Sequence, residues 1–302
     1  MCGIVGLHLK NPGLQPRLGE LLSVMLGAMT TRGPDSAGIA VYSDLPGPTG
    51  AEPVLRYSLR CEGGADWELA AKAIAADTGS DVAVRQLGPD AAVLESPAAE
   101  AVFLAAVRRA APAVTVVGWG RAMVLVKDVG APADICARYG IPGWGGYQGS
   151  GHTRMATESA VTTAHSHPFA PAADLALVHN GSFSNYATIR GRLARAGVYC
   201  ETDNDSEVAA RLIATRLAEG SSLEDALRTV LKEMDGFFTL LVTTRTQFAV
   251  VRDSFACKPA VIAQTSDYVA MASEYQALTG LPGISDAEVF EPMPEEIHLW
   301  SR

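Results

Sequence analysis

The sequence contains no long hydrophobic run. Its apolar stretches, such as Val114–Val117 and Phe237–Val242, are far shorter than the ~20 residues that a membrane-spanning helix needs. The first residues, MCGIVGLHLKNPG, also lack the basic start and the apolar length of a secretory signal. We therefore expect no membrane partner and a cytoplasmic protein.

Positive charge and phosphate-binding glycine motifs are scarce as well. The chain has 24 Lys and Arg against 33 Asp and Glu, a formal net charge of −9, and its basic residues form no cluster. Such a surface repels a nucleic-acid backbone, so no nucleic-acid partner is expected. Neither G-x-x-x-x-G-K-[ST] nor G-x-G-x-x-G before a helix occurs, so the sequence indicates no nucleotide site.

Cysteine is rare and shows no pairing pattern. The five residues are scattered without a C-x-x-C, at Cys2, Cys61, Cys136, Cys200 and Cys257. An odd, scattered set is typical of a protein from a reducing compartment rather than of a disulfide framework.

What the chain does have is the composition and periodicity of a folded globular protein. Its 302 residues are 48% hydrophobic and 19% charged, enough to bury a sizeable core. Apolar spacing predicts helices at Pro16–Met29, Asn185–Ala196, Asp205–Glu219 and Leu223–Met234. Extended runs predict strands at Cys2–Leu9, Ile39–Tyr42, Ala164–His167, Leu175–Val178 and in the tail from Phe238 onward.

Cys2 is the first candidate for chemistry. It becomes the N-terminal residue if Met1 is removed, which a small second residue permits. A terminal Cys combines a thiol of ordinary pKa about 8.5 with an α-amine of ordinary pKa about 7.7–8.0. The amine can then act as the local base for the thiol. Because many proteins begin Met-Cys without using the thiol, this residue is informative only in combination with other motifs of the chain.

A series of short motifs occurs after Cys2 along the chain. They are MCGIVG, TRGPDSAG (Thr31–Gly38), GHTRMAT (Gly151–Thr157), HSHPF (His165–Phe169), VHNGSFSNY (Val178–Tyr186), DNDSEV (Asp203–Val208), RDSFACKPAV (Arg252–Val261) and ASEYQAL (Ala272–Leu278). Together they resemble the class II glutamine amidotransferases, the N-terminal-nucleophile (Ntn) family, over residues 1–44 and about 145–278. The resemblance implies an α+β Ntn-hydrolase fold, a four-layer αββα sandwich of antiparallel sheets.

The resemblance also implies roles for individual residues in glutamine hydrolysis. Cys2 matches the nucleophile, and Arg32 matches the arginine that positions it. Asn180 and Gly181 match the pair that forms the oxyanion hole, through a side-chain amide and a backbone N–H.

Four further residues match the glutamine pocket. Arg154 corresponds to the arginine that holds the substrate α-carboxylate, for which a planar guanidinium is well suited. Asp205 corresponds to the acid that accepts the α-ammonium, and it also lies where it could cap the following helix. Thr157 and His179 are expected to line the same pocket.

The chain departs from these relatives in two ways. The gap between TRGPDSAG and GHTR is long, which predicts an inserted α/β subdomain at residues 60–140 within one amidotransferase domain, 1–302. No synthase domain follows the last motif, so a partner chain is expected to receive the ammonia. The resemblance is greatest to the glutaminase-type subunit of glutamate-synthase-like enzymes such as N-methylglutamate synthase. Flavin and iron–sulfur cofactors are then expected only in a partner chain, and none in this one.

Other interpretations remain open at this point. The chain could be a non-catalytic scaffold or regulatory subunit with a silent glutaminase site, or an Ntn amidase for a different amide. Arg154 and Asp205 weigh against the second, since together they match the two charged ends of an amino acid. A zinc site is conceivable at the closely spaced histidines, but no Cys or carboxylate lies at a structural-zinc spacing, so we predict no metal. These histidines are His152, His165, His167 and His179.

Overall fold

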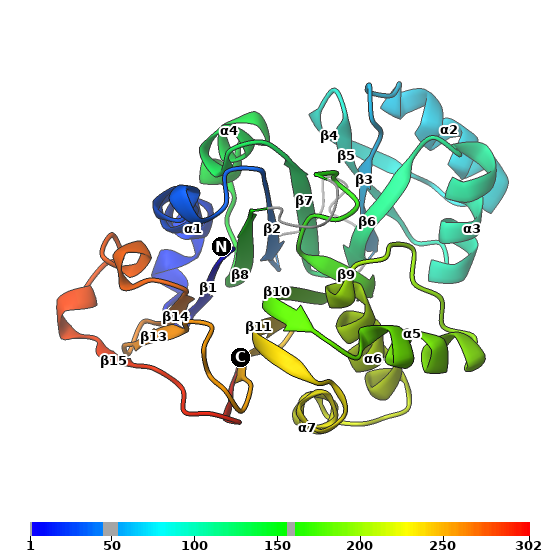
Figure 1. Ribbon diagram of the computed structural model, residues 1–302. Helices are drawn as coiled ribbons and strands as arrows, with labels where there is room; N and C mark the ends of the chain where they lie inside the picture. The colour runs from blue at the N-terminus through cyan, green and yellow to red at the C-terminus, as the bar shows by residue number, and fades with distance from the viewer. Residues whose placement is uncertain (1, 45–53, 156–160) are drawn as a thin grey trace.

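Two antiparallel β-sheets stacked face to face form the centre of the computed structural model, which describes residues 2–44, 54–155 and 161–302 (Figure 1). The first sheet has seven strands, in the order β15 (Glu288–Phe290), β13 (Val261–Gln264), β14 (Tyr268–Ala272), β1 (Gly3–Leu9), β8 (Gln148–Arg154), β2 (Ser36–Tyr42) and β7 (Met123–Val129). The second has five, in the order β16 (Ile297–Ser301), β12 (Gln247–Arg252), β11 (Gly236–Thr243), β10 (Leu175–Phe183) and β9 (Phe169–Ala172).

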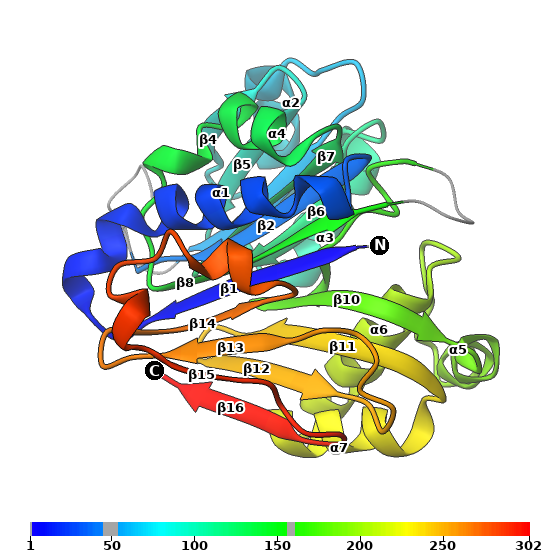
Figure 2. The ribbon, with the colours of Figure 1, turned by 60° about the vertical axis from the view of Figure 1, so that its left-hand side comes forward.

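Helices cover the outer face of each sheet (Figure 2). The seven-stranded sheet is covered by α1 (Leu18–Ala28) and α4 (Pro132–Arg138). The five-stranded sheet is covered by α5 (Tyr186–Arg195), α6 (Asp205–Ala218) and α7 (Leu223–Glu233). This arrangement confirms the predicted αββα sandwich of antiparallel sheets.

The apolar pattern of each element explains its place in these layers. In α7, Leu223, Leu227 and Val230 are buried at helical spacing, and Ser222 caps the helix by accepting the N–H of Asp225 at 3.1 Å. Between the sheets, the inward faces of the strands meet in a fully buried apolar layer. It includes Ile4, Val178, Leu241, Phe248 and Met271.

A third sheet belongs to the inserted element, which Figure 1 shows beside the sandwich. Its strand order is β4 (Ala83–Gly88), β5 (Ala91–Ser96), β3 (Leu55–Arg60) and β6 (Thr115–Gly120), with α2 (Trp67–Thr78) and α3 (Glu100–Ala110) packed on it. It has a core of its own, in which the rings of Tyr57 and Phe103 stack 3.8 Å apart.

The limits of this element differ from the predicted range of 60–140. The four-stranded sheet occupies residues 55–120, whereas β7 pairs with β2 in the main sheet and α4 packs beside α1. An apolar run such as Met123–Val126 shows that a strand is present but not which sheet it joins. The chain crosses between the two sheets at residues 121–122, where Asp174 accepts the N–H groups of Arg121, Ala122 and Met123, each at 2.9 Å.

The segment before β9 also differs from its expected structure. Residues 164–167, predicted as a strand, form turns and bends that lead to Pro168, whose peptide bond is cis. Among the described residues, no helix combines the length and apolar character needed to cross a membrane.

Candidate active site

Cys2 lies at the start of β1, the central strand of the seven-stranded sheet, and two of the predicted residues hold its carbonyl oxygen. Arg32 Nε donates to it at 2.9 Å and Asn180 Nδ2 at 3.1 Å. The Cys2 side chain is only partly buried, and Sγ lies 4.0 Å from the carbonyl oxygen of Met155, just beyond β8. The backbone of Cys2 is thus fixed while its thiol stays accessible.

Arg32 reaches Cys2 from the short 3-10 turn Thr30–Arg32 that follows α1. Its guanidinium is largely buried, and Nη1 forms an ion pair with Glu274 Oε1 at 2.5 Å. A planar guanidinium with donors in fixed directions can hold a carbonyl and a carboxylate at once, which an ammonium on a flexible chain does poorly.

The residues after β14 were not assigned a role from the sequence, yet they help to fix β1. Ser273 Oγ accepts the N–H of Ile4 at 2.9 Å, and the Ser273 N–H donates to the Ile4 carbonyl at 2.9 Å. Glu274 anchors Arg32. The ASEYQAL motif, which contains Ser273 and Glu274, could have indicated these residues from the sequence. A motif alone, however, does not say which strand its residues contact.

Asn180 and Gly181 lie near the end of β10, beside β11. Asn180 is buried, with its amide directed at Cys2. Gly181 has φ +148°, and a Cβ there would lie 2.0 Å from the carbonyl oxygen of Phe237. The backbone conformation and the approach of β11 therefore both require glycine at this position.

Asp205 is the first residue of α6 and connects that helix to the end of β10. Its Oδ2 accepts the N–H of Phe183 at 2.9 Å, and Oδ1 accepts the hydroxyl of Ser206 at 3.2 Å. The helix cap is the preceding residue, Asn204, whose side chain accepts the Ser206 N–H at 2.9 Å. Asp205 is therefore not the cap that the sequence suggested, and its carboxylate faces the strand instead.

His179 lies next to Asp205 and is buried. Its Nδ1 is 2.7 Å from Ser206 Oγ and 3.9 Å from Asp205 Oδ1, and its ring stacks on Phe183. Burial lowers the pKa of His179 from its ordinary value, although the Asp205 carboxylate opposes that shift. A lowered pKa favours the neutral form of the ring near pH 7.

Arg154 is the last residue of β8, the strand directly beside β1. Thr153 is the register partner of Gly3, so Arg154 follows the residue opposite the start of β1. The TRGPDSAG turn packs on its backbone: the Arg154 carbonyl accepts the N–H of Asp35 at 3.1 Å, and a Cβ on Gly33 would lie 2.5 Å from the Arg154 nitrogen. Thr157, the other predicted pocket residue on this segment, lies outside the described residues.

The four clustered histidines do not converge on one point. His165 is hydrogen-bonded to Asp203 at 2.6 Å. His152 donates from Nε2 to the His179 carbonyl at 3.0 Å, and its ring is 4.1 Å from that of His167. Across the described ranges, no three His, Cys, Asp or Glu side chains are placed to hold a metal ion.

The sequence is similar to glutamine amidotransferases along its whole length. The family described as glutamine amidotransferase domain matches residues 152–280. GlxB, a glutamine amidotransferase-like protein of Rhizobium meliloti, is 46% identical over 99% of this chain and 98% of its own length. A relative from Methanothermobacter thermautotrophicus, also named as a glutamine amidotransferase, is 33% identical over 97% of both chains.

Solved structures show the same fold at lower identity. The glutamine phosphoribosylpyrophosphate amidotransferase of B. subtilis matches 100% of this chain with a TM-score of 0.62 and 18% identity. This chain covers only 49% of that protein, about half its length. At such identity the likeness establishes the fold alone.

Proposed function

The chain belongs to the class II glutamine amidotransferases, and from this premise we propose that it hydrolyses L-glutamine to glutamate and ammonia with Cys2 as the nucleophile. The observation that carries the proposal is the pair of hydrogen bonds that fixes the Cys2 carbonyl oxygen. Arg32 and Asn180 come from distant parts of the sequence and hold the same carbonyl oxygen, leaving the thiol accessible.

In the proposed reaction, removal of Met1 frees the α-amine of Cys2, which takes the thiol proton. The thiolate attacks the side-chain amide carbon of glutamine and forms a tetrahedral intermediate. The amide nitrogen receives the proton as its bond to carbon breaks, so ammonia leaves and a thioester remains. Water then attacks the thioester and releases glutamate and the thiol.

Asn180 can donate hydrogen bonds both to the backbone of the nucleophile Cys2 and to the oxyanion. A primary amide nitrogen carries two protons. One holds the Cys2 carbonyl at 3.1 Å, which leaves the second for the oxygen of the intermediate, together with the Gly181 N–H. Removing one such donor typically lowers kcat by about 10²–10³.

Arg154 and Asp205 would bind the two charged groups of the substrate. In this proposal Arg154 pairs with the α-carboxylate, and the Asp205 carboxylate accepts the α-ammonium, with Thr157 and His179 beside them. An Ntn amidase for uncharged acyl groups has no use for this pair.

The ammonia is proposed to pass to a partner synthase chain of the N-methylglutamate synthase or glutamate synthase type, in which flavin and iron–sulfur groups reside. The similarity to GlxB supports the ammonia-producing half of this proposal, because GlxB is named as a glutamine amidotransferase-like protein. The alternative is a scaffold subunit with a silent site.

Mass spectrometry of the N-terminal peptide after treatment with 6-diazo-5-oxo-norleucine tests the proposal. This glutamine-shaped electrophile should leave an adduct on a peptide that begins at Cys2. Cys257, which is exposed, supplies the matched control: Cys257→Ala should keep the labelling, and Cys2→Ala should lose it together with glutaminase activity. An unlabelled peptide that keeps Met1 would support the scaffold alternative.

A further inference from the structure

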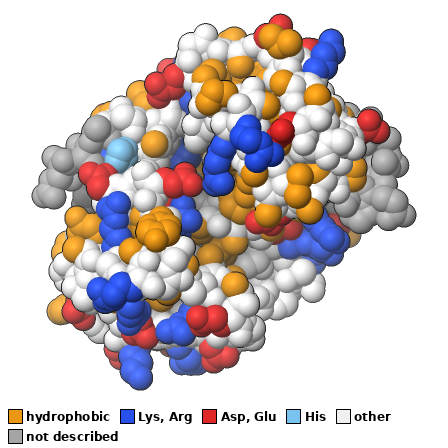
Figure 3. All heavy atoms as spheres, turned by 90° about the vertical axis from the view of Figure 1, so that its right-hand side faces the viewer, with side chains coloured by type: hydrophobic (Ala, Val, Ile, Leu, Met, Phe, Trp, Pro, Cys, Tyr) orange, Lys and Arg blue, Asp and Glu red, His pale blue; other side chains and the backbone are white. Residues whose placement is uncertain are grey.

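A cavity of about 650 Å³ lies away from Cys2, where the inserted element meets the sandwich. Figure 3 shows a hollow on this face of the molecule, with hydrophobic side chains inside it. One wall comes from α3 and β6, and the other from β9, from the start of α6 and from the segment before β9. None of the predicted glutamine-site residues that the structure describes lines it.

Lys127 of β7 is a buried cation in the wall of this cavity. The residue is only 7% exposed, and Nζ donates to the carbonyl oxygen of Ser166 at 2.8 Å. Its ammonium lies 4.9 Å from the centre of the Phe169 ring, a cation–π contact. Among the described residues no carboxylate lies within 4.0 Å of Nζ, and burial lowers the pKa of Lys127 to about 8.

Glu62, Glu201 and Glu207 are the acidic residues that line the cavity, and the last two are already engaged. Glu207 pairs with Arg211 Nε at 2.6 Å and also accepts the N–H groups of Glu201 and Thr202. Glu201 is 3.5 Å from Arg211, and its side chain is 70% exposed. Neither carboxylate forms an ion pair with Lys127, although both favour its charged form from a longer distance.

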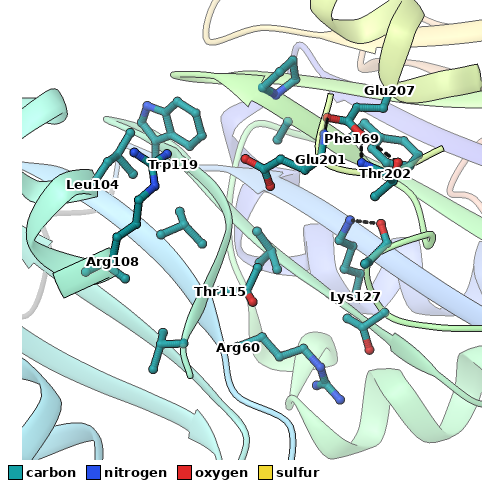
Figure 4. Close-up of a pocket in the computed structure, with 18 of the residues that line it drawn as sticks. Arg60, Leu104, Arg108, Thr115, Trp119, Lys127, Phe169, Glu201, Thr202 and Glu207 are labelled. Atoms are coloured by element: carbon teal, nitrogen blue, oxygen red, sulfur yellow. Dashed lines mark hydrogen bonds between the residues drawn. The ribbon is translucent and has the colours of Figure 1, made fainter. Parts of the chain in front are cut away.

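Arg108 is a second cation without an ion-pair partner among the described residues, on the side of the cavity opposite Lys127. It lies on α3 and is exposed, and within the described ranges no carboxylate is in ion-pair distance of it. Figure 4 shows Arg108 and Trp119 on one side of the space, with Lys127 and Phe169 on the other. The remaining wall is largely aliphatic, made by Leu104, Val107, Val114, Val116 and Val117.

We propose that this cavity binds a small organic carboxylate, with its charged end on Lys127 and its hydrocarbon part against the valine and aromatic wall. A carboxylate would supply the ion-pair partner that the buried ammonium does not have among the described residues. Inorganic phosphate fits less well, because a dianion requires more than one buried cation and gains nothing from an apolar wall. The site is separate from the glutamine pocket and does not depend on the proposed hydrolysis.

Calorimetric titration of the full chain with 4-phenylbutyrate tests the site, with the neutral 4-phenylbutyramide as the matched ligand. The carboxylate should bind with one-to-one stoichiometry, and the amide at least tenfold more weakly. Lys127→Met keeps the aliphatic packing and should weaken binding about tenfold or more, and Arg108→Ala should weaken it severalfold. Arg109→Ala is the control, because Arg109 follows Arg108 on the same helix but is paired with Asp77 and does not line the cavity.

A second measurement needs no variant. Limited acetylation with acetic anhydride, followed by peptide mass spectrometry, should show Lys127 protected by 4-phenylbutyrate while Lys72, exposed on α2, reacts unchanged. Equal binding of acid and amide, no saturable binding at millimolar concentrations, or wild-type affinity in a folded Lys127→Met would each overturn the proposal.

Discussion

Arg32 shows how one side chain can join three separated parts of the sequence. Its guanidinium connects the Cys2 carbonyl at one end of the chain with Glu274 after β14. The TRGPDSAG motif identified Arg32, but not its acidic partner. Local spacing cannot reveal a pair that is formed only when β14 lies beside β1.

Gly181→Ala should destabilise the protein and impair glutamine hydrolysis together. A Cβ at this position meets backbone atoms, 2.0 Å from Phe237 O and 2.7 Å from Phe238 Cα, at φ +148°. We expect the free energy of unfolding to fall by about 1–3 kcal/mol or more, as measured by urea denaturation.

Gly27→Ala provides the control for that substitution. Gly27 lies in α1, and outside the adjoining backbone of its own helix no described atom comes within 4 Å of where a Cβ would lie. Alanine there should leave activity unchanged and raise stability by about 0.5–1 kcal/mol. Equal stability of the two variants would contradict the packing argument.

Among the elements, those with long, regular apolar spacing were predicted well. Helices α1, α6 and α7 lie within a few residues of their expected limits, because their buried faces repeat at helical spacing. The expected strand at 164–167 is absent because its polar residues make local turn contacts, such as Ser166 Oγ to the Thr162 carbonyl at 2.9 Å.

Two adjacent residues at the start of α6 are expected to have different roles: Asn204 caps the helix, and Asp205 binds the substrate. Asn204→Ala removes the cap and should lower the free energy of unfolding by about 1 kcal/mol, with little change in the KM for glutamine. Asp205→Asn keeps an acceptor for the Phe183 N–H but removes the charge, so KM should rise at least tenfold with little change in stability. Glutaminase kinetics give the KM of both variants, and urea unfolding gives their stability. A loss of stability without a rise in KM in Asp205→Asn would show that Asp205 is structural.

At the scale of the whole molecule, buried neutral histidines make the protein sensitive to acid. Burial lowers the pKa of His152 to about 3, and it also lowers the pKa values of His167 and His179. In the unfolded chain these groups bind protons near the ordinary pKa of about 6.5. Stability should therefore fall as the pH drops below about 6.5, because the unfolded state then binds more protons than the folded state.

Urea titrations between pH 7 and pH 5 measure this loss. Each histidine kept neutral in the fold adds up to about 1.4 kcal/mol per pH unit to the slope. His152→Gln should reduce the slope by about one proton. An unchanged slope in that variant would mean that His152 does not resist protonation.

The cavity and the exact extent of the inserted element were beyond sequence reasoning. Lys127 stands in an apolar run that predicts only a strand, and its burial arises from the packing of β6 and β9 against β7. Contacts of this kind depend on how separate layers meet, which the periodicity of a single strand does not record.

The pairing of β2 with β7 has a consequence for the history of the chain. Tyr42 and Met123 are directly opposite each other, so the two points at which the inserted element leaves and rejoins the sandwich are neighbours. If Asn-Gly joined Tyr42 directly to Arg121, β2 and β7 would form a hairpin whose loop is Asn, Gly, Arg121 and Ala122. This loop would retain all three N–H groups that Asp174 accepts. The shortened chain should fold and keep its glutaminase activity. An ancestor could therefore have gained or lost the whole element in a single genetic event, without rearranging the sheets that carry Cys2.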